Sequence, residues 1–156
     1  MDQETENRCV VRVIKRNELV VRRYCSDDQQ AVIDLWDRCG LLRPWNNPMK
    51  DIGRKLSANP DWFLVAVVRN KIAGSIMIGY EGHRGWINYL AVEPSLRRQG
   101  IGRRLMEEAE MLLQKAGCPK INLQIRSTNS EAAGFYVSLG YVRDDVISLG
   151  KRIDPD

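Results

Sequence analysis

Helical spacing of apolar residues, together with the capping signals beside it, predicts four helices. Ser26 opens a capping box before the first helix, and Asn47 with Pro48 marks the start of the second. Ile101 begins the apolar face of the third, and Gly117 suits the left-handed position after its end. The first predicted helix runs from the capping box at 26–29 to residue 39, and the others cover residues 47–58, 100–116 and 130–140.

Runs rich in β-branched and aromatic residues predict strands between these helices. Two runs flank the tight turn Arg69-Asn70 and a third follows the loop EGHRG, so we expect a three-stranded antiparallel meander. The third helix separates the run ending at Val92 from INLQIR, which predicts a right-handed parallel crossover. The predicted strands cover residues 19–24, 62–68, 71–80, 86–92, 121–126 and 145–153.

Length and composition restrict the class of protein. A chain of 156 residues with 44% hydrophobic residues can bury one core without disulfides or metal, so we expect one domain over 18–156 after an N-terminal extension over 1–17. The polar start MDQETENR differs from a secretory signal, and no apolar run reaches the ~18 residues of a spanning helix. We therefore expect a cytoplasmic protein with no membrane partner.

The cysteines and the histidine do not form a metal-binding pattern. Cys9, Cys25, Cys39 and Cys118 contain no CxxC pair, and His83 is the only histidine. We expect reduced, packed thiols and no metal site.

The segment RRQGIG at 97–102 carries the strongest chemical signal. Glycine lowers helix propensity by about 1 kcal/mol relative to Ala, and basic residues oppose the dipole at a helix N-terminus. Free N–H groups at such a terminus bind phosphate oxygens, and glycines allow a pyrophosphate to approach them. In a chain of net charge +4, Arg97, Arg98, Arg103 and Arg104 add attraction. The segment therefore predicts a phosphate-bearing ligand, the plain alternative being a solvated helix start.

Two common phosphate-binding motifs do not fit this segment. The dinucleotide fingerprint GxGxxG needs a third glycine where Leu105 stands, and no GK[ST] follows at the spacing of a P-loop. Nucleotide-binding folds of these two types are disfavoured.

The segment instead resembles the signature [RQ]xxGxG/A of the GNAT superfamily of acyl-CoA-dependent N-acetyltransferases. A second stretch is similar to the family's NxxAxxxY…GF ending, and the resemblance covers roughly residues 18–153. The matching positions are Arg97, Gly100 and Gly102, then Asn129, Ala132, Tyr136, Gly140 and Tyr141, the last replacing the commoner Phe. The resemblance implies an α+β, GNAT-like fold with a mostly antiparallel twisted sheet of about seven strands and about four flanking helices.

The resemblance also implies acetyl-CoA as cosubstrate, with no metal. The pyrophosphate would lie on the amides of 98–103, and the pantetheine arm would enter a gap between the strands 86–92 and 121–126. Asn129 would contact that arm, the alternative being a plain N-cap. The implied cofactor-binding residues are Leu90, Ala91, Val92, Arg97, Arg98, Gln99, Gly100, Ile101, Gly102, Arg103, Asn129 and Tyr136.

Catalysis by such an enzyme needs help for the leaving thiolate and for the attacking amine. Tyr136 is the implied donor to sulfur, although transfer from a phenol of pKa ~10 to a thiolate of pKa ~8.5 is uphill by about 2 kcal/mol. Glu81, His83 and Tyr89 are candidate bases, directly or through water. The alternatives are a core position for Tyr136, turn positions for Glu81 and His83, and packing for Tyr89.

The expected function is acetyl transfer from acetyl-CoA to a primary amine of a small molecule or peptide, through direct attack and a tetrahedral intermediate. The linker residues Arg43, Pro44, Trp45 and Asn46 are candidates for the acceptor pocket. Two rival hypotheses are a noncatalytic acyl-CoA sensor and a basic nucleic-acid-binding protein. An aromatic content of 7% and the lack of a nucleic-acid motif disfavour the second. A monomer and a homodimer both remain open.

Overall fold

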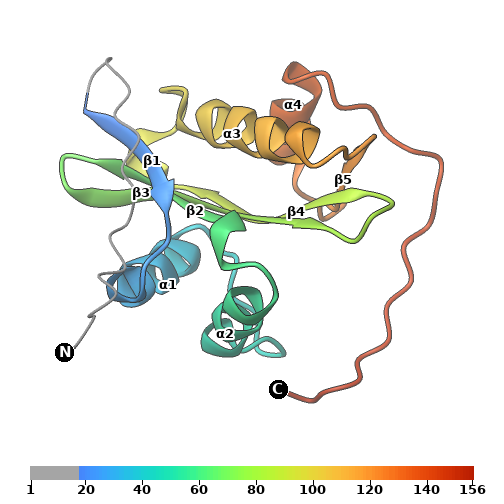
Figure 1. The fold of residues 1–156 in the computed structure, drawn as a ribbon, viewed down its shortest axis with the longest axis horizontal. Coiled ribbons are helices and arrows are strands. Elements are labelled where there is room, and N and C mark those ends of the chain that lie inside the picture. The colour runs from blue at the N-terminus through green and yellow to red at the C-terminus, as the bar shows by residue number, and fades with distance from the viewer. Residues whose placement is uncertain (1–17) are drawn as a thin grey trace, which may run out of the picture.

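The computed structural model describes residues 18–156, which form a five-stranded sheet in the order β1-β2-β3-β4-β5 with helices on both faces (Figure 1). The predicted extension over 1–17 lies outside the described residues. The elements are β1 (Leu19–Arg23), α1 (Gln29–Arg38), α2 (Pro48–Ala58), β2 (Phe63–Val68), β3 (Lys71–Tyr80), β4 (Gly85–Val92), α3 (Ile101–Lys115), β5 (Ile121–Leu123) and α4 (Ser130–Ser138).

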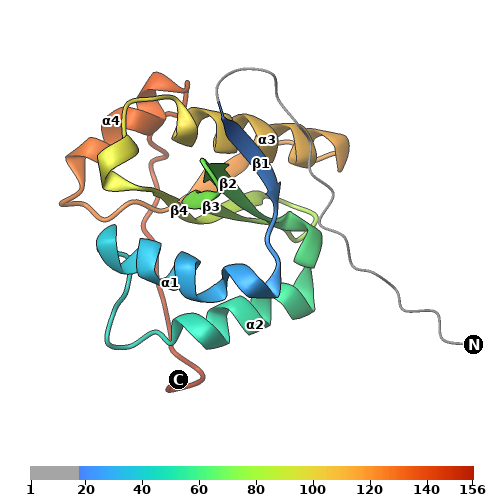
Figure 2. The same ribbon diagram turned by 90° about the vertical axis from the view of Figure 1, so that its left-hand side faces the viewer.

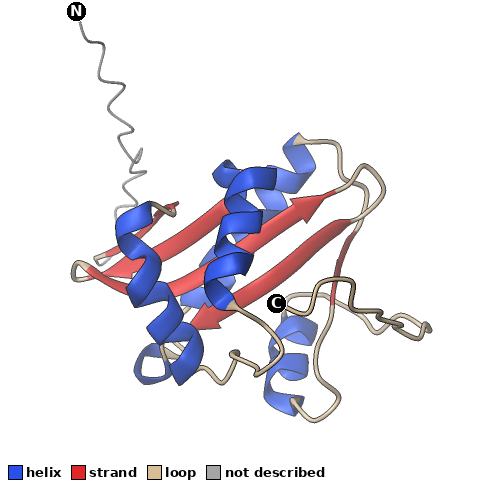
Figure 3. Ribbon diagram, turned by 90° about the horizontal axis from the view of Figure 1, so that it is seen from below, coloured by secondary structure: helices blue, strands red, loops and turns tan. Residues whose placement is uncertain are grey.

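The sheet separates two helical layers, as Figure 2 shows: α1 and α2 cover one face, and α3 and α4 cover the other. Figure 3 looks onto the first face, with the strands running behind its two helices. Strands β1 to β4 pair antiparallel in sequence order, and β5 pairs parallel to β4 after the α3 crossover. The mixed class, the antiparallel meander and the parallel crossover are confirmed.

Two-residue alternation along the strands gives each face its own core. In β2, Leu64 and Ala66 pack toward α3, whereas Phe63 and Val65 pack toward α1. On the face covered by α1, Trp36 is fully buried, and its ring centroid lies 6.3 Å from that of Phe63. The period of two read from the sequence therefore corresponds to two buried faces.

The predicted strand over 145–153 is wrong. From Val142 to Asp156 the chain joins no strand of the sheet. Asp144 accepts from Lys120, which precedes β5, and from Asn122 within β5. The apolar side chains Ile147 and Leu149 are 84% and 88% exposed. Alternating apolar residues stabilise a strand only where one face is covered, and no layer of the described chain covers this segment. The sheet accordingly has five strands, fewer than the resemblance implies.

Candidate active site

A short turn after β4 carries the motif residues into α3. Gly100 caps the helix in the left-handed conformation, with φ of 86°, and Arg98 also has a positive φ of 63°. The first helical bond runs from the Arg104 amide to the Gly100 carbonyl, 3.0 Å, so the amides of residues 101–103 precede the helical ladder. In the described part of the chain, no side chain caps this end. The turn therefore presents free donors at the positive end of a helix dipole.

The two motif glycines serve different physical purposes. A Cβ at Gly100 would meet no atom within 4 Å, so this glycine is required for its φ and leaves open space beside the amides. A Cβ at Gly102 would lie 3.1 Å from Phe135 Cζ and 3.4 Å from Val92 Cγ2. The sequence interpretation assigned both glycines to the ligand, whereas Gly102 allows α4 to pack on α3.

The arginines around the turn are not equivalent. Arg98 and Arg103 are exposed, and Arg97 Nε donates to the Val92 carbonyl over 3.4 Å. Arg104 instead forms an ion pair with Glu108 one turn further along α3. Within residues 18–156, the side chains of Arg98 and Arg103 form no hydrogen bond or ion pair, in contrast to those of Arg97 and Arg104.

The edge of β4 that leads to the turn is unpaired on one side. Parallel pairing with β5 covers Gly85–Ile87 and ends at the pair Ile87 and Leu123. On its other side β4 stays paired to β3 as far as Val92. Within residues 18–156, the stretch from Leu90 to Val92 therefore has no strand on its β5 side. On this side an extended ligand could pair with the strand, and the Val92 carbonyl accepts from the side chains of Arg97 and Cys39.

A β-bulge interrupts β4 at the start of this free edge. The register passes from Ser75 opposite Ala91 to Met77 opposite Asn88, so Tyr89 and Leu90 together face Ile76. Tyr89 has a positive φ of 49°, which is strained for a residue with a side chain. No sequence signal identified this bulge, because tyrosine gives no local indication of a left-handed conformation.

A buried chain of contacts holds Tyr89 in that conformation. The Trp36 indole N–H donates to Ser75 Oγ over 2.8 Å, and the Ser75 hydroxyl donates to the Tyr89 carbonyl over 2.9 Å. The Trp36 ring also stacks on the Tyr89 ring, with centroids 3.9 Å apart. The Tyr89 hydroxyl donates to Asp51 Oδ2 over 2.6 Å. Burial, and next the bond to Asp51, raise the pKa of Tyr89 well above its usual value.

Tyr136 lies half-buried on α4, beside the third helix. Its ring makes edge contacts with Phe135 at 5.1 Å and Tyr141 at 5.8 Å. Burial raises the pKa of Tyr136 to about 12. Tyr141, by contrast, donates its hydroxyl proton to Glu110 over 3.0 Å. Tyr136 therefore packs against the core and stays a neutral phenol at physiological pH.

Two predicted residues have structural contacts of their own. Asn129 caps α4, its side-chain oxygen accepting from the Ala132 amide over 3.1 Å. Glu81 accepts from the amides of His83 and Arg84 in its own turn, over 3.0 and 2.7 Å. These bonds, the Arg84 amide first, hold the pKa of Glu81 below its usual value. Glu81 and His83 lie before the start of β4, at the other end of the strand from the glycine turn.

The linker between α1 and α2 borders a cavity of about 380 Å³. Trp45 on this linker is 50% exposed, and the guanidinium of Arg126, which follows β5, lies 5.9 Å from its ring centroid. The linker thus reaches across to the segment after β5. The cavity is lined by Gln30, Ile33, Pro44, Asn46, Asn47, Pro48, Met49 and Asp156.

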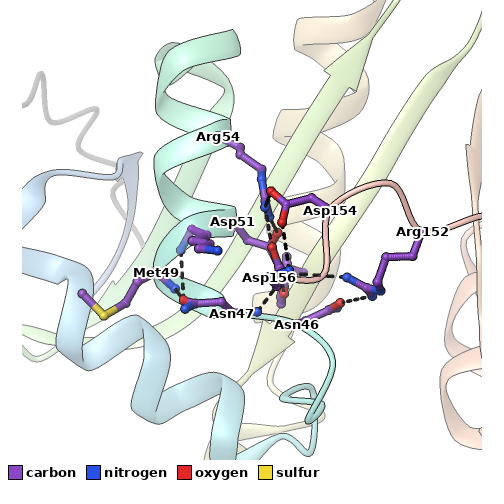
Figure 4. Close-up of polar contacts among 10 residues, drawn as sticks. Asn46, Asn47, Met49, Asp51, Arg54, Arg152, Asp154 and Asp156 are labelled. Atoms are coloured by element: carbon purple, nitrogen blue, oxygen red, sulfur yellow. Dashed lines mark hydrogen bonds and ion pairs between the residues drawn. The ribbon is translucent and has the colours of Figure 1, made fainter.

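The C-terminal segment forms one wall of this region, as Figure 4 shows. Asp156 accepts from the Asn47 amide over 3.2 Å and pairs with Arg54, and Arg152 donates to Asn46 Oδ1 over 2.9 Å. The bond from Arg54, and next that from Asn47, lower the pKa of Asp156 to about 2. Sequence reasoning missed this cluster because its partners are far apart in the chain.

Comparison with known proteins identifies the family. A profile of the Acetyltransferase (GNAT) family matches residues 29–141, more than half of the chain. The chain belongs to this family. An acetyltransferase of Pectobacterium atrosepticum is 50% identical over 136 residues, 87% of this chain and 96% of the relative. An uncharacterized N-acetyltransferase of Yersinia pestis is 46% identical, with the same two coverages.

Solved structures agree with this assignment. The NatC complex bound to Gag peptide and CoA is similar with a TM-score of 0.71 and 27% identity, over 82% of this chain and 87% of that chain. The family, the relatives and the fold together show that this GNAT protein is an acetyltransferase. Within residues 18–156 no helix is long and apolar enough to cross a membrane, and no cluster of three or more ligating side chains could hold a metal ion.

Proposed function

We propose that this acetyltransferase uses acetyl-CoA to acetylate a primary amine of a small molecule or peptide. The observation that carries the proposal is the free edge Leu90–Val92, which leads directly into the uncapped amides behind Gly100. A ligand with an extended polar arm and a pyrophosphate matches both features at once. The NatC complex, with its bound peptide and CoA, supports both the donor and the acceptor class.

The donor binds along this edge in the proposal. The pyrophosphate accepts hydrogen bonds from the amides of residues 98–103. The exposed side chains of Arg98 and Arg103, at the two ends of this stretch, attract it by their positive charge. The pantetheine arm pairs with Leu90–Val92, running back toward the point where β4 and β5 join. This direction brings the thioester to the bulge at Tyr89 and Leu90.

Transfer then takes place by direct attack. The amine nitrogen adds to the thioester carbon, the carbonyl electrons move to oxygen, and the intermediate collapses with loss of thiolate. With the pKa of Tyr136 at about 12, proton transfer to a thiolate of pKa ~8.5 would cost about 5 kcal/mol. We therefore assign Tyr136 a hydrogen bond to the departing sulfur, with the proton of CoA supplied by solvent.

An assay of CoA release over a panel of amines tests the proposal. The panel contains a peptide with a free α-amine, free lysine, spermidine and an aminoglycoside. At least one amine should release CoA stoichiometrically with its own acetylation, and Tyr136→Phe should lower turnover roughly 100-fold with little change in acetyl-CoA affinity. Acetyl-CoA binding without transfer to any amine would make the protein a sensor and refute the proposal. Binding to DNA or RNA at physiological salt, without any thermal shift by acetyl-CoA, would favour the nucleic-acid hypothesis.

A further inference from the structure

We propose that Asp51, held in place by Tyr89, binds the acceptor amine and takes its proton. This inference rests on the proposed acetyl transfer and names a residue that neither the motifs nor the sequence analysis identified. Asp51 lies on α2, in the helical layer opposite α3 and α4, and its Oδ2 is 2.6 Å from the Tyr89 hydroxyl. An amine could thus approach the bulge from the α2 side while the donor occupies the β4 edge.

Tyr89 lies in the bulge of the β3–β4 ladder, two residues beyond Ile87, where the pairing of β4 with β5 ends. Tyr89 lies three residues before Val92, so a ligand arm paired with Leu90–Val92 covers about 10 Å at ~3.3 Å per residue before it reaches Tyr89. The thioester and the Tyr89–Asp51 bond therefore meet at the same place. No candidate base named from the sequence combines this position with a carboxylate.

The Asp51 side chain is partly open to solvent, with 24% of its surface exposed. Oδ2 accepts from Tyr89 and Oδ1 accepts from Arg54 over 3.1 Å, and each oxygen keeps a further lone pair. The carboxylate is therefore fixed in orientation but has capacity for an ammonium N–H.

The rival bases are less suited to this role than Asp51. Glu81 uses its carboxylate to close its own turn beyond the other end of β4. Tyr89 is a poor base, since burial and Asp51 keep it protonated. Its contacts with Trp36 and Ser75 fix the ring, so Tyr89 acts as a positioning residue that orients Asp51.

The proton balance of the reaction follows. The acceptor arrives as an ammonium, which Asp51 attracts by charge, and loses one proton through Asp51 to solvent. The neutral nitrogen forms the C–N bond, and Asp51 takes the second proton as the C–S bond breaks and then releases it to solvent, which restores the carboxylate. Solvent gives one proton to the thiolate. The net reaction converts ammonium and acetyl-CoA into amide, CoA thiol and one released proton.

Charged and titratable groups from three elements lie around Asp51. Arg54 and Lys50 lie on α2, the Tyr89 phenol reaches it from β4, and Asp154 and Asp156 pair with Arg54 from the C-terminal segment. Because this network could itself require Asp51 for structure, the test needs readouts that a purely structural role would not change.

The experiment compares Asp51→Asn, Asp51→Ala and Tyr89→Phe with the wild-type enzyme on the amine that it acetylates. Asp51→Asn should lower kcat/KM about 100-fold, and Tyr89→Phe about 10-fold, while acetyl-CoA affinity stays within about 2-fold. Added formate should restore part of the activity of Asp51→Ala, because a free carboxylate replaces the missing base. The matched control Asp61→Asn removes an equal charge from an exposed pair with Arg23 and should match wild type.

The outcomes separate the two proposals. Wild-type kcat/KM in Asp51→Asn, or no response of Asp51→Ala to formate, would overturn the role of Asp51 while acetyl transfer itself stands. If Asp51→Asn does not fold, unchanged kinetics in Tyr89→Phe would overturn it instead. A wild-type protein that binds acetyl-CoA but acetylates no amine would overturn the proposed function and this inference together.

Discussion

Removal of the Ser75 hydroxyl tests how buried hydrogen bonds stabilise this fold. Ser75 is fully buried on β3, accepts the Trp36 indole N–H and donates to the carbonyl of strained Tyr89. Ser75→Ala removes an acceptor and a donor at once, with a volume change of only one oxygen. The variant therefore tests polar satisfaction rather than packing.

The magnitude follows from the two groups that lose a partner. The indole N–H of fully buried Trp36 would have no acceptor, and an unsatisfied buried donor costs about 1–3 kcal/mol. Loss of the bond to the Tyr89 carbonyl adds about 1 kcal/mol. The unfolding free energy should fall by about 3 kcal/mol, which for a chain of this size lowers Tm by about 6–12 °C.

Urea unfolding of a double-mutant cycle measures this effect. In the Trp36→Phe background the donor is absent, so Ser75→Ala should cost about 2 kcal/mol less than in wild type. The same substitution should reduce acetyl transfer, because Tyr89 loses part of its support. A loss below about 0.5 kcal/mol in the wild-type background, or additive costs in the cycle, would refute the reasoning.

Three further substitutions test other parts of the structure. Gly100→Ala should lower the free energy of unfolding by about 1 kcal/mol, because Gly100 has a φ of 86°, and should weaken acetyl-CoA binding in calorimetry. Unchanged affinity would contradict pyrophosphate binding at this turn. Gly102→Ala should cost about 1–3 kcal/mol in urea unfolding through the 3.1 Å contact with Phe135, and a neutral effect would refute that packing. Burial raises the pKa of Asp28, but bonds from Arg22 outweigh it and hold that pKa below its usual value. The stability that the ionised Asp28 adds is fully present above its unfolded pKa of about 3.9, and it is lost as pH falls through the folded pKa. Asp28→Asn should therefore lower the free energy of unfolding by about 3 kcal/mol at pH 7 and by less at pH 3. An equal loss at both pH values would contradict the role given to the Arg22–Asp28 pair.

Much of the fold could be predicted because its signals are local. The Asn47 cap and Pro48 begin α2 as expected, with the Asn47 side chain accepting from the amides of Met49 and Lys50. Gly117 ends α3 with φ of 79°. The failed strand over 145–153 shows the limit of this reasoning. Its alternation is genuine, but pairing depends on a covering layer that the sequence does not reveal.

The candidate site was predictable only in part, for a similar reason. The glycine turn is contiguous in sequence, so its motif and its geometry coincide. The support for Tyr89 comes from Trp36, Ser75 and Asp51 on three other elements, and it becomes visible only when the sheet forms. Gly102 has the expected residue type, although its physical reason is the contact with Phe135.

A crystal structure of the enzyme with bound CoA tests the central claim most directly. The account predicts pyrophosphate oxygens within hydrogen-bond distance of the amides behind Gly100, and a pantetheine arm paired with Leu90–Val92 that ends beside Tyr89. CoA bound elsewhere, with this edge of β4 unoccupied, would contradict the account.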